Sequence, residues 1–230
     1  MLKLNIIMGS TREGRAGEPV LEWIRRRAEA HGAFDVNVLD LRDWKLPMFA
    51  ETFATIGDFA NPTYSAPIVK DWNQEIVEAD ALIFITPEYN HAYSGELKNA
   101  IDNVFVSWGL RNKPAGMVAY SGGPIGGARA VEQLALVLVE AEMVPLRNSV
   151  LIPDVNNAFD EGAVPANPVL DIALTVLLEH LAWWTRVTHA ARGEGELKPG
   201  VLRFRELFDD LSQGTRRRGS SLHCRPSGAV

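Results

Sequence analysis

Apolar residues along the first 190 positions follow two alternating patterns. Short runs that are continuously apolar, or that alternate with polar residues, predict β-strands. These strands are expected over 2–8, 34–41, 79–86, 114–121 and 149–155. Between most of them, apolar residues recur every three or four positions, which predicts helices. The helices are expected over 19–32, 96–108, about 131–138 and about 168–192, the last with Asn167 as its N-cap.

The run 79–86, "ADALIFIT", is apolar almost throughout, as expected for a central parallel strand that is covered on both faces. Strands that alternate with helices predict an α/β fold in which an open, doubly wound parallel sheet of five strands carries helices on both faces. Such sheets bind ligands beyond the carboxyl ends of their strands. The loops 9–18, 87–95 and 121–127 are therefore the candidate binding loops.

Two segments stand apart from this alternation. The connection 43–65 is long for a compact domain, which is typical of a lid or an interface segment. The alternative is a loop that covers the sheet edge, with Leu46, Met48 and Phe49 tucked beneath it. Residues 1–192 are expected to form one domain, and 193–230 a C-terminal extension that is helical over 199–211 and then disordered.

Charge and composition exclude several classes of protein. The net charge is −6, and four arginines among residues 212–230 leave the body with 19 cationic against 29 acidic side chains, a net −10. An acidic body argues against nucleic acid as a partner. We see no segment long and apolar enough to span a membrane, and no signal peptide. The single cysteine, Cys224, rules out a disulfide framework and indicates the cytoplasm.

The first candidate loop, "MGSTREGRAGEP", has the composition of a phosphate cradle. Free N–H groups and the positive end of a helix dipole favour an anion, and Arg12 and Arg15 can add charged hydrogen bonds. The alternative is a tight turn capped by Ser10. Arg15-Ala16 stands where a P-loop needs Lys and Ser/Thr, and no G-x-G-x-x-G is present. What remains is a site for a terminal monophosphate, such as that of FMN.

The other two loops suit a flat ligand. In "TPEYNHAYSGEL", Glu88 and Asn90 offer polar groups and Tyr89 an aromatic ring. In "SGGPIGGARA", four glycines allow the backbone to approach a ligand closely. Each loop alone has an ordinary structural explanation, as a capped polar loop or a glycine-rich turn. His91 is left open between a substrate contact and a solvent-facing residue.

Together, "GSTREGRAGEPV", "TPEYNHAYSGELKNAID" and "YSGGPIGGARA" resemble the signature segments of the flavodoxin-like NADPH-dependent FMN reductases, which include quinone, azo-dye and chromate reductases. The resemblance covers roughly residues 1–190 and implies a flavodoxin-like three-layer sandwich. It also implies a homodimer or homotetramer to which the 97–108 helix contributes. The tail beyond residue 192 departs from the family.

The resemblance also implies the roles of the site residues. The FMN phosphate would be surrounded by Ser10, Arg12, Arg15 and Gly17. The isoalloxazine edge would be lined by Pro87, Glu88, Tyr89 and Asn90, with Ser121, Gly122 and Gly123 on its other side.

No side chain is singled out as a catalytic acid, base or nucleophile, because neither Ser10 nor Ser121 sits in G-x-S-x-G. The histidines show no metal-ligand spacing, so no metal site is expected. The sequence therefore predicts an enzyme that binds FMN non-covalently and passes electrons from NADPH or NADH to a small acceptor such as a quinone. The bound cofactor supplies the chemistry. Two alternatives are an FMN-binding electron-transfer or sensing module, and a flavin-free α/β interaction protein.

Overall fold

The computed structural model describes residues 1–58 and 61–220, and its centre is a parallel sheet. The strands lie in the order β2-β1-β5-β6, and β6 pairs on its far side with both β7 and β8. Every pairing within this sheet is parallel. The strands are β1 (Leu2–Met8), β2 (Phe34–Asp40), β5 (Ala81–Pro87), β6 (Pro114–Tyr120), β7 (Val144–Pro145) and β8 (Val150–Ile152). All five predicted strands are present, although the last one is shorter than expected.

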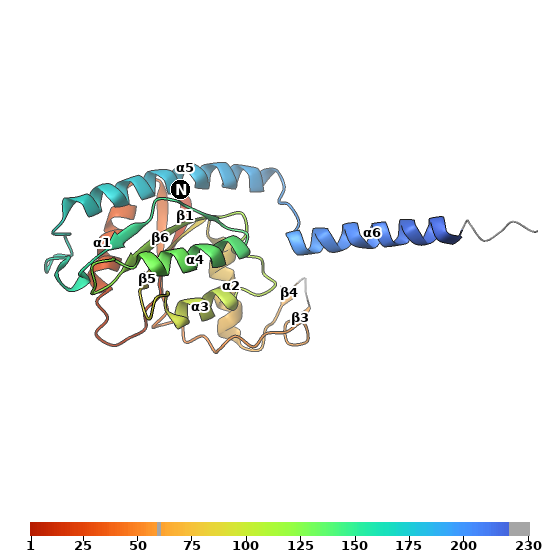
Figure 1. Cartoon of the computed structure of the whole chain (residues 1–230), viewed down its shortest axis with the longest axis horizontal. Coiled ribbons are helices and arrows are strands. Elements are labelled where there is room, and N and C mark those ends of the chain that lie inside the picture. Colours follow the sequence, from red (N-terminus) through yellow and green to blue (C-terminus); the bar gives the residue numbers. More distant parts are fainter. Residues whose placement is uncertain (59–60, 221–230) are drawn as a thin grey trace, which may run out of the picture. The chain divides into compact units, whose positions relative to one another are not determined.

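Helices cover both faces of this sheet (Figure 1). One face carries α1 (Glu18–Ala30) and α5 (Pro168–Glu194); the other carries α2 (Pro67–Glu78), α3 (Gly95–Asp102) and α4 (Ala128–Glu140). The three-layer sandwich predicted from the sequence is therefore confirmed. The expected cap of α5 is present, because the Asn167 side chain accepts a hydrogen bond from Val169 N at 3.0 Å.

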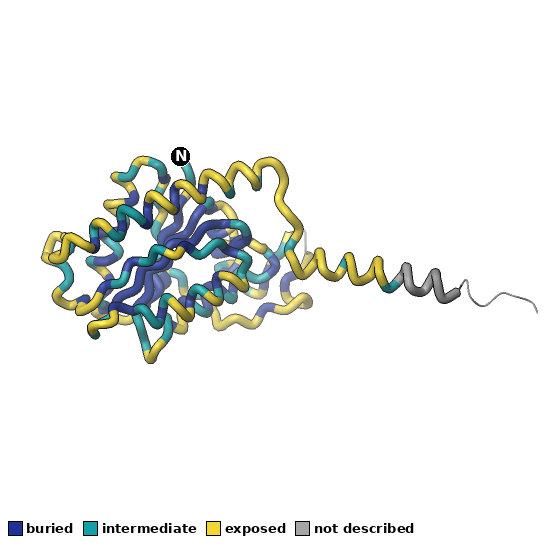
Figure 2. Tube along the Cα trace, turned by 45° about the horizontal axis from the view of Figure 1, so that its top comes forward, coloured by how far each residue is buried: buried dark blue, intermediate teal, exposed yellow. Residues whose placement is uncertain are grey.

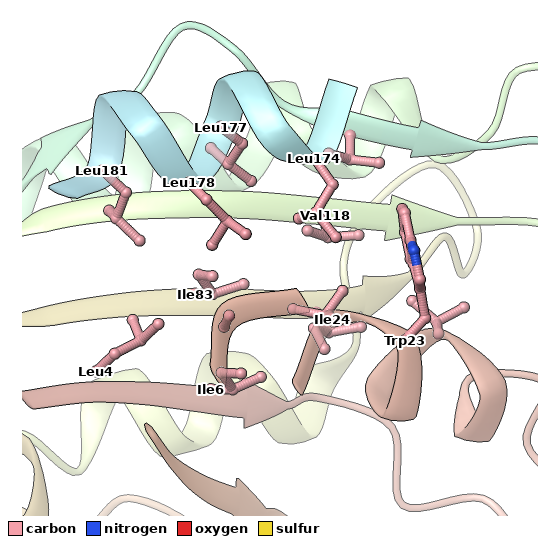
Figure 3. Close-up of a cluster of buried hydrophobic side chains, with 14 of the residues drawn as sticks. Leu4, Ile6, Trp23, Ile24, Ile83, Val118, Leu174, Leu177, Leu178 and Leu181 are labelled. Carbon is pink, nitrogen blue, oxygen red and sulfur yellow. The ribbon is translucent and has the colours of Figure 1, made fainter. Parts of the chain in front are cut away.

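The strand β5 shows how the apolar pattern builds two cores. Ile83 and Ile85 point to the α1/α5 side, where they meet Leu177 and Leu178 of α5 among others, as Figure 3 shows for Ile83 and both leucines. Leu82 and Phe84 point to the opposite side, which α2, α3 and α4 cover. Buried residues accordingly lie along the central strands (Figure 2). Two buried faces explain why this strand reads as a continuous apolar run.

The helix α2 was not predicted from the sequence. It follows the long connection 43–65, and its buried residues Val69, Trp72 and Ile76 do recur at helical spacing. Pro67 at its first position favours a helix start. The missed helix supplies the crossover between β2 and β5, so the alternation of strands and helices is complete.

The helix predicted over 96–108 is shorter than expected, since α3 ends at Asp102. The Asn103 side chain donates to the carbonyls of Pro47 and Asn99, competing with a continued helix. Val106 and Trp108 then adopt positive φ angles of 55°, which a helix forbids. The apolar residues beyond Asp102 therefore belong to an irregular segment.

The connection 43–65 contains a short antiparallel hairpin of β3 (Gly57–Asp58) and β4 (Asn61–Pro62). Of the three residues that could have been tucked beneath it, only Leu46 is half-buried. Met48 is 80% exposed and Phe49 is 39% exposed. The interpretation as a simple cover with all three residues beneath is thus wrong. Instead, the ring of Phe49 packs edge-on against that of Phe105, with the ring centres 5.6 Å apart.

The chain divides into two compact units, residues 1–194 and 195–230. In the second unit, α6 runs from Gly200 to Ser220, nine residues beyond the expected end of the tail helix at Leu211. Phe204, Leu207, Phe208 and Leu211 are exposed on it. Of the part of the tail that was expected to be disordered, residues 212–220 are helical and residues 221–230 lie outside those described. Within 1–58 and 61–220, no helix has the length and apolarity needed to cross a bilayer.

Candidate functional site

The three predicted loops meet at one cleft beyond the carboxyl ends of β1, β5 and β6. The cleft has a volume of about 340 Å³. Its lining consists of Arg12, Gly14, Arg15, Ala16, Pro87, Glu88, Tyr89, Tyr120, Ser121, Gly122, Val155 and Asn156. Parallel strands bring their carboxyl ends to the same edge, which is why segments more than 100 residues apart in sequence converge here.

The first loop offers unpaired donors. No backbone N–H from Thr11 to Gly14 donates to a protein acceptor among the described residues. The Arg12 guanidinium makes no ion pair there and lies 5.4 Å from the centre of the Tyr89 ring. Free N–H groups before a helix N-terminus, together with an unpaired cation, fit an anion such as the terminal phosphate of FMN.

Arg15 lies in a different environment from Arg12. Its side chain is 1% exposed and makes ion pairs with Asp40 and with Glu18, the latter at 3.1 Å. It also donates to the carbonyl of Ser10. Burial alone would lower the pKa of Arg15, but the hydrogen bonds to Asp40 and Glu18 raise it above its ordinary value. In this arrangement Arg15 fastens the loop to the end of β2.

Asp40 stays ionised as the partner of Arg15. Burial would raise the pKa of this carboxyl, but the hydrogen bonds from Arg15 and from the backbone N–H of Arg42 hold it below the usual range. The charges of the pair therefore compensate each other within the protein.

Ser10 and Tyr89 join the first loop to the second. The two hydroxyls are 2.9 Å apart, and Ser10 is fully buried. Tyr89 and Ala92 exchange two backbone hydrogen bonds, of 2.8 and 3.1 Å, around a two-residue turn. Asn90 and His91 form this turn with φ angles of 48° and 75°, as in a type I′ turn. The side chains of Asn90 and His91 are exposed at its tip.

Glu88 connects the second loop to the helix after the third. Its side chain is 4% exposed and pairs with Arg129, in the first turn of α4. The other oxygen of the Glu88 carboxylate, Oε2, is buried and has no hydrogen-bond partner among the residues that the structure describes. A buried acceptor without a partner is costly unless a ligand donates to it. Because Glu88 lines the cleft, this oxygen fits the polar edge of a bound ring.

The glycines of the third loop have two different roles. A Cβ on Gly127 would lie 2.6 Å from the Ala119 Cβ, and its φ is 88°, so this glycine is needed for the chain to fold. By contrast, a Cβ on Gly122 or Gly123 would meet nothing closer than 3.8 Å. Packing does not require glycine there, whereas close approach of a flat ligand does. The N–H of Gly122 also has no partner among the described residues.

The residues predicted from the sequence fall into two groups. Those that line the cleft are Arg12, Arg15, Pro87, Glu88, Tyr89, Ser121 and Gly122. Ser10, Gly17, Asn90 and Gly123 do not line it. Gly17 is buried where a Cβ would lie 2.5 Å from the Tyr120 hydroxyl, so its role is to let Tyr120 pack beneath the loop.

Sequence reasoning missed Asp40, Tyr120, Arg129 and Asn156. Asp40 and Tyr120 are the last residues of β2 and β6, and an acidic residue at a strand's carboxyl end is a signal that could have been used. Tyr120 is buried, which raises its pKa and keeps the hydroxyl protonated. Asn156 comes from a 3-10 turn, η1 (Val155–Asn157), that no pattern in the sequence indicates.

Comparisons with known proteins place the chain in a family. The profile of the family described as NADPH-dependent FMN reductase matches residues 2–157. An NAD(P)H-dependent FMN reductase of Schizosaccharomyces pombe is 31% identical over 209 residues, which are 90% of each chain. A 2-hydroxy-1,4-benzoquinone reductase of a Burkholderia species is 28% identical, over 72% of this chain and 84% of its own.

Among solved structures, the flavoenzyme NAD(P)H:(acceptor) oxidoreductase FerB from Paracoccus denitrificans superimposes with a TM-score of 0.66. It covers 82% of this chain and 99% of its own, at 21% identity, which supports the flavodoxin-like fold. The family profile spans well over half of the chain, and the S. pombe protein is a relative along nearly its whole length. This chain therefore belongs to the NADPH-dependent FMN reductase family.

Proposed function

We propose that this protein binds FMN non-covalently in the cleft and uses NADPH or NADH to reduce a small quinone-like acceptor. The observation that carries the proposal is the combination of two walls of the cleft, one rich in hydrogen-bond donors and one with space for a ring. On one wall lie Arg12 and Gly14, whose backbone N–H groups have no acceptor among the described residues, and the Arg12 guanidinium makes no ion pair there. On the other, a Cβ on Gly122 would meet nothing closer than 3.8 Å, so the backbone there leaves room for a flat ring. This combination suits a phosphate at one end and a flat ring at the other.

Different residues would bind the phosphate and the ring of FMN. Arg12 and the loop N–H groups would hold the phosphate, while Arg15 keeps that loop fixed to Asp40. Tyr89, Pro87 and Gly122 would bound the ring. When bound, FMN supplies the redox chemistry, accepting a hydride from the nicotinamide and passing electrons to the acceptor.

Two backbone donors that border the cleft are already engaged. The N–H groups of Glu88 and Tyr89 already donate to the carbonyls of Tyr120 and Ala92, so they are not free to stabilise negative charge on a ring. The N–H of Gly122 has no acceptor in the described part of the chain and takes that role in the proposal. The quinone-like acceptor is supported by the similarity to the benzoquinone reductase.

One set of measurements tests the proposal. The purified protein should show a flavin absorption spectrum or quench the fluorescence of added FMN, and it should oxidise NADPH or NADH in the presence of a quinone. Bound flavin without turnover of either nicotinamide would instead indicate an electron-transfer or sensing module. A protein that neither carries flavin nor binds FMN would be a flavin-free α/β interaction protein.

We also propose that the protein is a homo-oligomer that forms through the outer face of α4 and the segment after α3. Leu136 and Val139 are 69% and 60% exposed on α4. Beside them, Phe105 and Trp108 line a hollow of about 360 Å³. Exposed apolar surface of this kind marks an interaction site. Leu136→Asp should lower the mass measured by light scattering, and an unchanged mass would exclude this face.

The proposed location is the cytoplasm, on the strength of the single cysteine. Fractionation of cells that express the tagged protein would test it.

A further inference from the structure

A second cavity adjoins the cleft across the first loop. It has a volume of about 600 Å³, larger than the cleft itself. It is lined by Thr11, Leu41, Arg42, Trp44, Lys45, Leu46, Met48, Gly95, Glu96 and Asn99. Thr11 lines this cavity and its neighbour Arg12 lines the cleft, so one loop forms a wall of both hollows.

The walls of this second cavity combine apolar and cationic groups. Trp44 is half-buried and held edge-on against Trp72, with ring centres 5.2 Å apart. Leu46 is half-buried and packs against the core beneath. Together with Leu41 and Met48, these side chains provide a surface for a flat aromatic group.

The two cationic side chains of the cavity, Arg42 and Lys45, differ in whether they already have partners. The Arg42 guanidinium donates to the carbonyl of Arg12 at 3.0 Å and pairs with Glu18 at 3.0 Å, so it is already engaged. Lys45 is exposed and has no hydrogen-bond or ion-pair partner among the described residues. The one carboxylate in the lining, Glu96, accepts a hydrogen bond from Thr11 at 3.3 Å. Lys45 is therefore the cation free to meet an anion.

We infer that this cavity binds the adenosine 2′-phosphate end of NADPH, with Lys45 contacting the 2′-phosphate. The inference rests on the proposed function, which requires a nicotinamide dinucleotide to reach the cleft. At about 340 Å³, the cleft offers little room for a flavin and a whole dinucleotide together. The adjoining cavity supplies the missing space, an aromatic wall for the purine, and a point charge for a phosphate. It follows that the protein prefers NADPH over NADH.

The direct test is a binding measurement that needs no turnover. Adenosine 2′,5′-bisphosphate and adenosine 5′-monophosphate are titrated into the FMN-loaded protein in a calorimeter. We expect the bisphosphate to bind more tightly. Lys45→Ala should weaken it about tenfold, in line with the loss of one charged hydrogen bond, and should leave the monophosphate unchanged. Lys70→Ala, which removes an exposed lysine of α2 that is not in the lining, is the matched control.

A second variant fills the cavity. Gly95 is in the lining, and a Cβ placed on it would meet nothing within 4 Å. Gly95→Leu should therefore fold and should weaken both nucleotides. In steady state, Lys45→Ala should raise the KM for NADPH about tenfold, with kcat and the KM for NADH unchanged.

Specific results would overturn the inference. They are equal affinity of the wild type for the two nucleotides, a bisphosphate affinity that survives Lys45→Ala, or nucleotide binding that survives Gly95→Leu. Failure of the proposed function is recognised separately, by the absence of bound flavin or of turnover with NADH and NADPH alike.

Discussion

The two ends of the parallel sheet differ in how completely their charged residues are paired. At the amino ends of the strands, Asp80 accepts hydrogen bonds from the backbone N–H of Lys3, from His189 at 2.7 Å and from Arg192 at 3.0 Å. Lys113 donates to the last carbonyls of α2, Ile76 and Val77. At the carboxyl ends, the Arg12 guanidinium and the N–H groups around it have no such partners within residues 1–58 and 61–220.

This difference distinguishes charged groups that stabilise the fold, which we call structural charges, from charged groups available to a ligand, which we call binding charges. Polar groups that satisfy one another fix α5 and α2 to the sheet, and their removal costs stability. Polar groups that are left unsatisfied in a concave site cost stability in the free protein and recover it when a ligand binds. The contrast recurs within a single loop, where Arg15 is ion-paired and the Arg12 guanidinium makes no ion pair with any described residue.

The largest effect is expected from Arg12→Ala. If Arg12 is a binding charge, this change should weaken FMN by about ten- to a hundredfold, the effect of losing hydrogen bonds to a charged group. It should leave the free energy of unfolding of the flavin-free protein nearly unchanged. Fluorescence titration and urea unfolding measure the two effects. Arg186→Ala, at an exposed arginine of α5, is the control; equal FMN affinity of both variants would refute the role of Arg12.

Asp80→Ala probes the opposite end. It should lower the free energy of unfolding by about 2 kcal/mol, since it leaves the partly buried Arg192 without its carboxylate. The FMN affinity should stay as in the wild type. Asp35→Ala, at an exposed position on β2, should change neither quantity. A loss of FMN affinity in Asp80→Ala would mean that the two ends are coupled.

The pH dependence of stability tests the structural role of Asp80 as well. Burial would raise the pKa of Asp80, but its hydrogen bonds with the Lys3 N–H and His189 hold it below the ordinary carboxyl value. A lowered folded pKa means that the stabilisation is complete above the unfolded pKa of about 3.9 and is lost as the pH falls below it. Asp80→Ala should therefore lose less stability than the wild type between pH 6 and pH 3. Identical losses in urea midpoints would contradict this assignment.

The smallest expected effect concerns backbone strain beside the cleft. His91 occupies a positive-φ position that Asn-Gly turns normally fill with glycine. His91→Gly should raise the free energy of unfolding by roughly 0.5 kcal/mol, because the strain is relieved. An unchanged KM for the quinone would show that His91 faces solvent, whereas a raised KM would show that it meets the acceptor.

Much of the fold could be predicted because periodicity reports directly on burial. The run from Ala81 to Ile85 identified the central strand, and the stripe within 131–138 identified α4. The limits of α3 could not be predicted, because side chains from a distant segment decide them: Asn103 bonds to Pro47, more than 50 residues away. Local propensity carries no information on such contacts.

The site was predicted less completely than the fold. Its loops could be located, because strand ends and glycines mark them. The different roles of Arg12 and Arg15 could not be predicted, since the two residues look equivalent in sequence. Only the position of Asp40, 25 residues further on, makes one of them an anchor.

Two short strands, β7 and β8, share one side of β6, and this affects how copies of this chain can meet. On that side of β6, β7 has two residues and ends in Pro145, which lacks an N–H, and β8 has three. Such short edges cannot template a strand from a neighbouring molecule. On the opposite edge, the longer β2 carries Asp35, Asn37 and Asp40. The short strands on one edge and the polar side chains on the other thus oppose edge-to-edge pairing of sheets into fibrils.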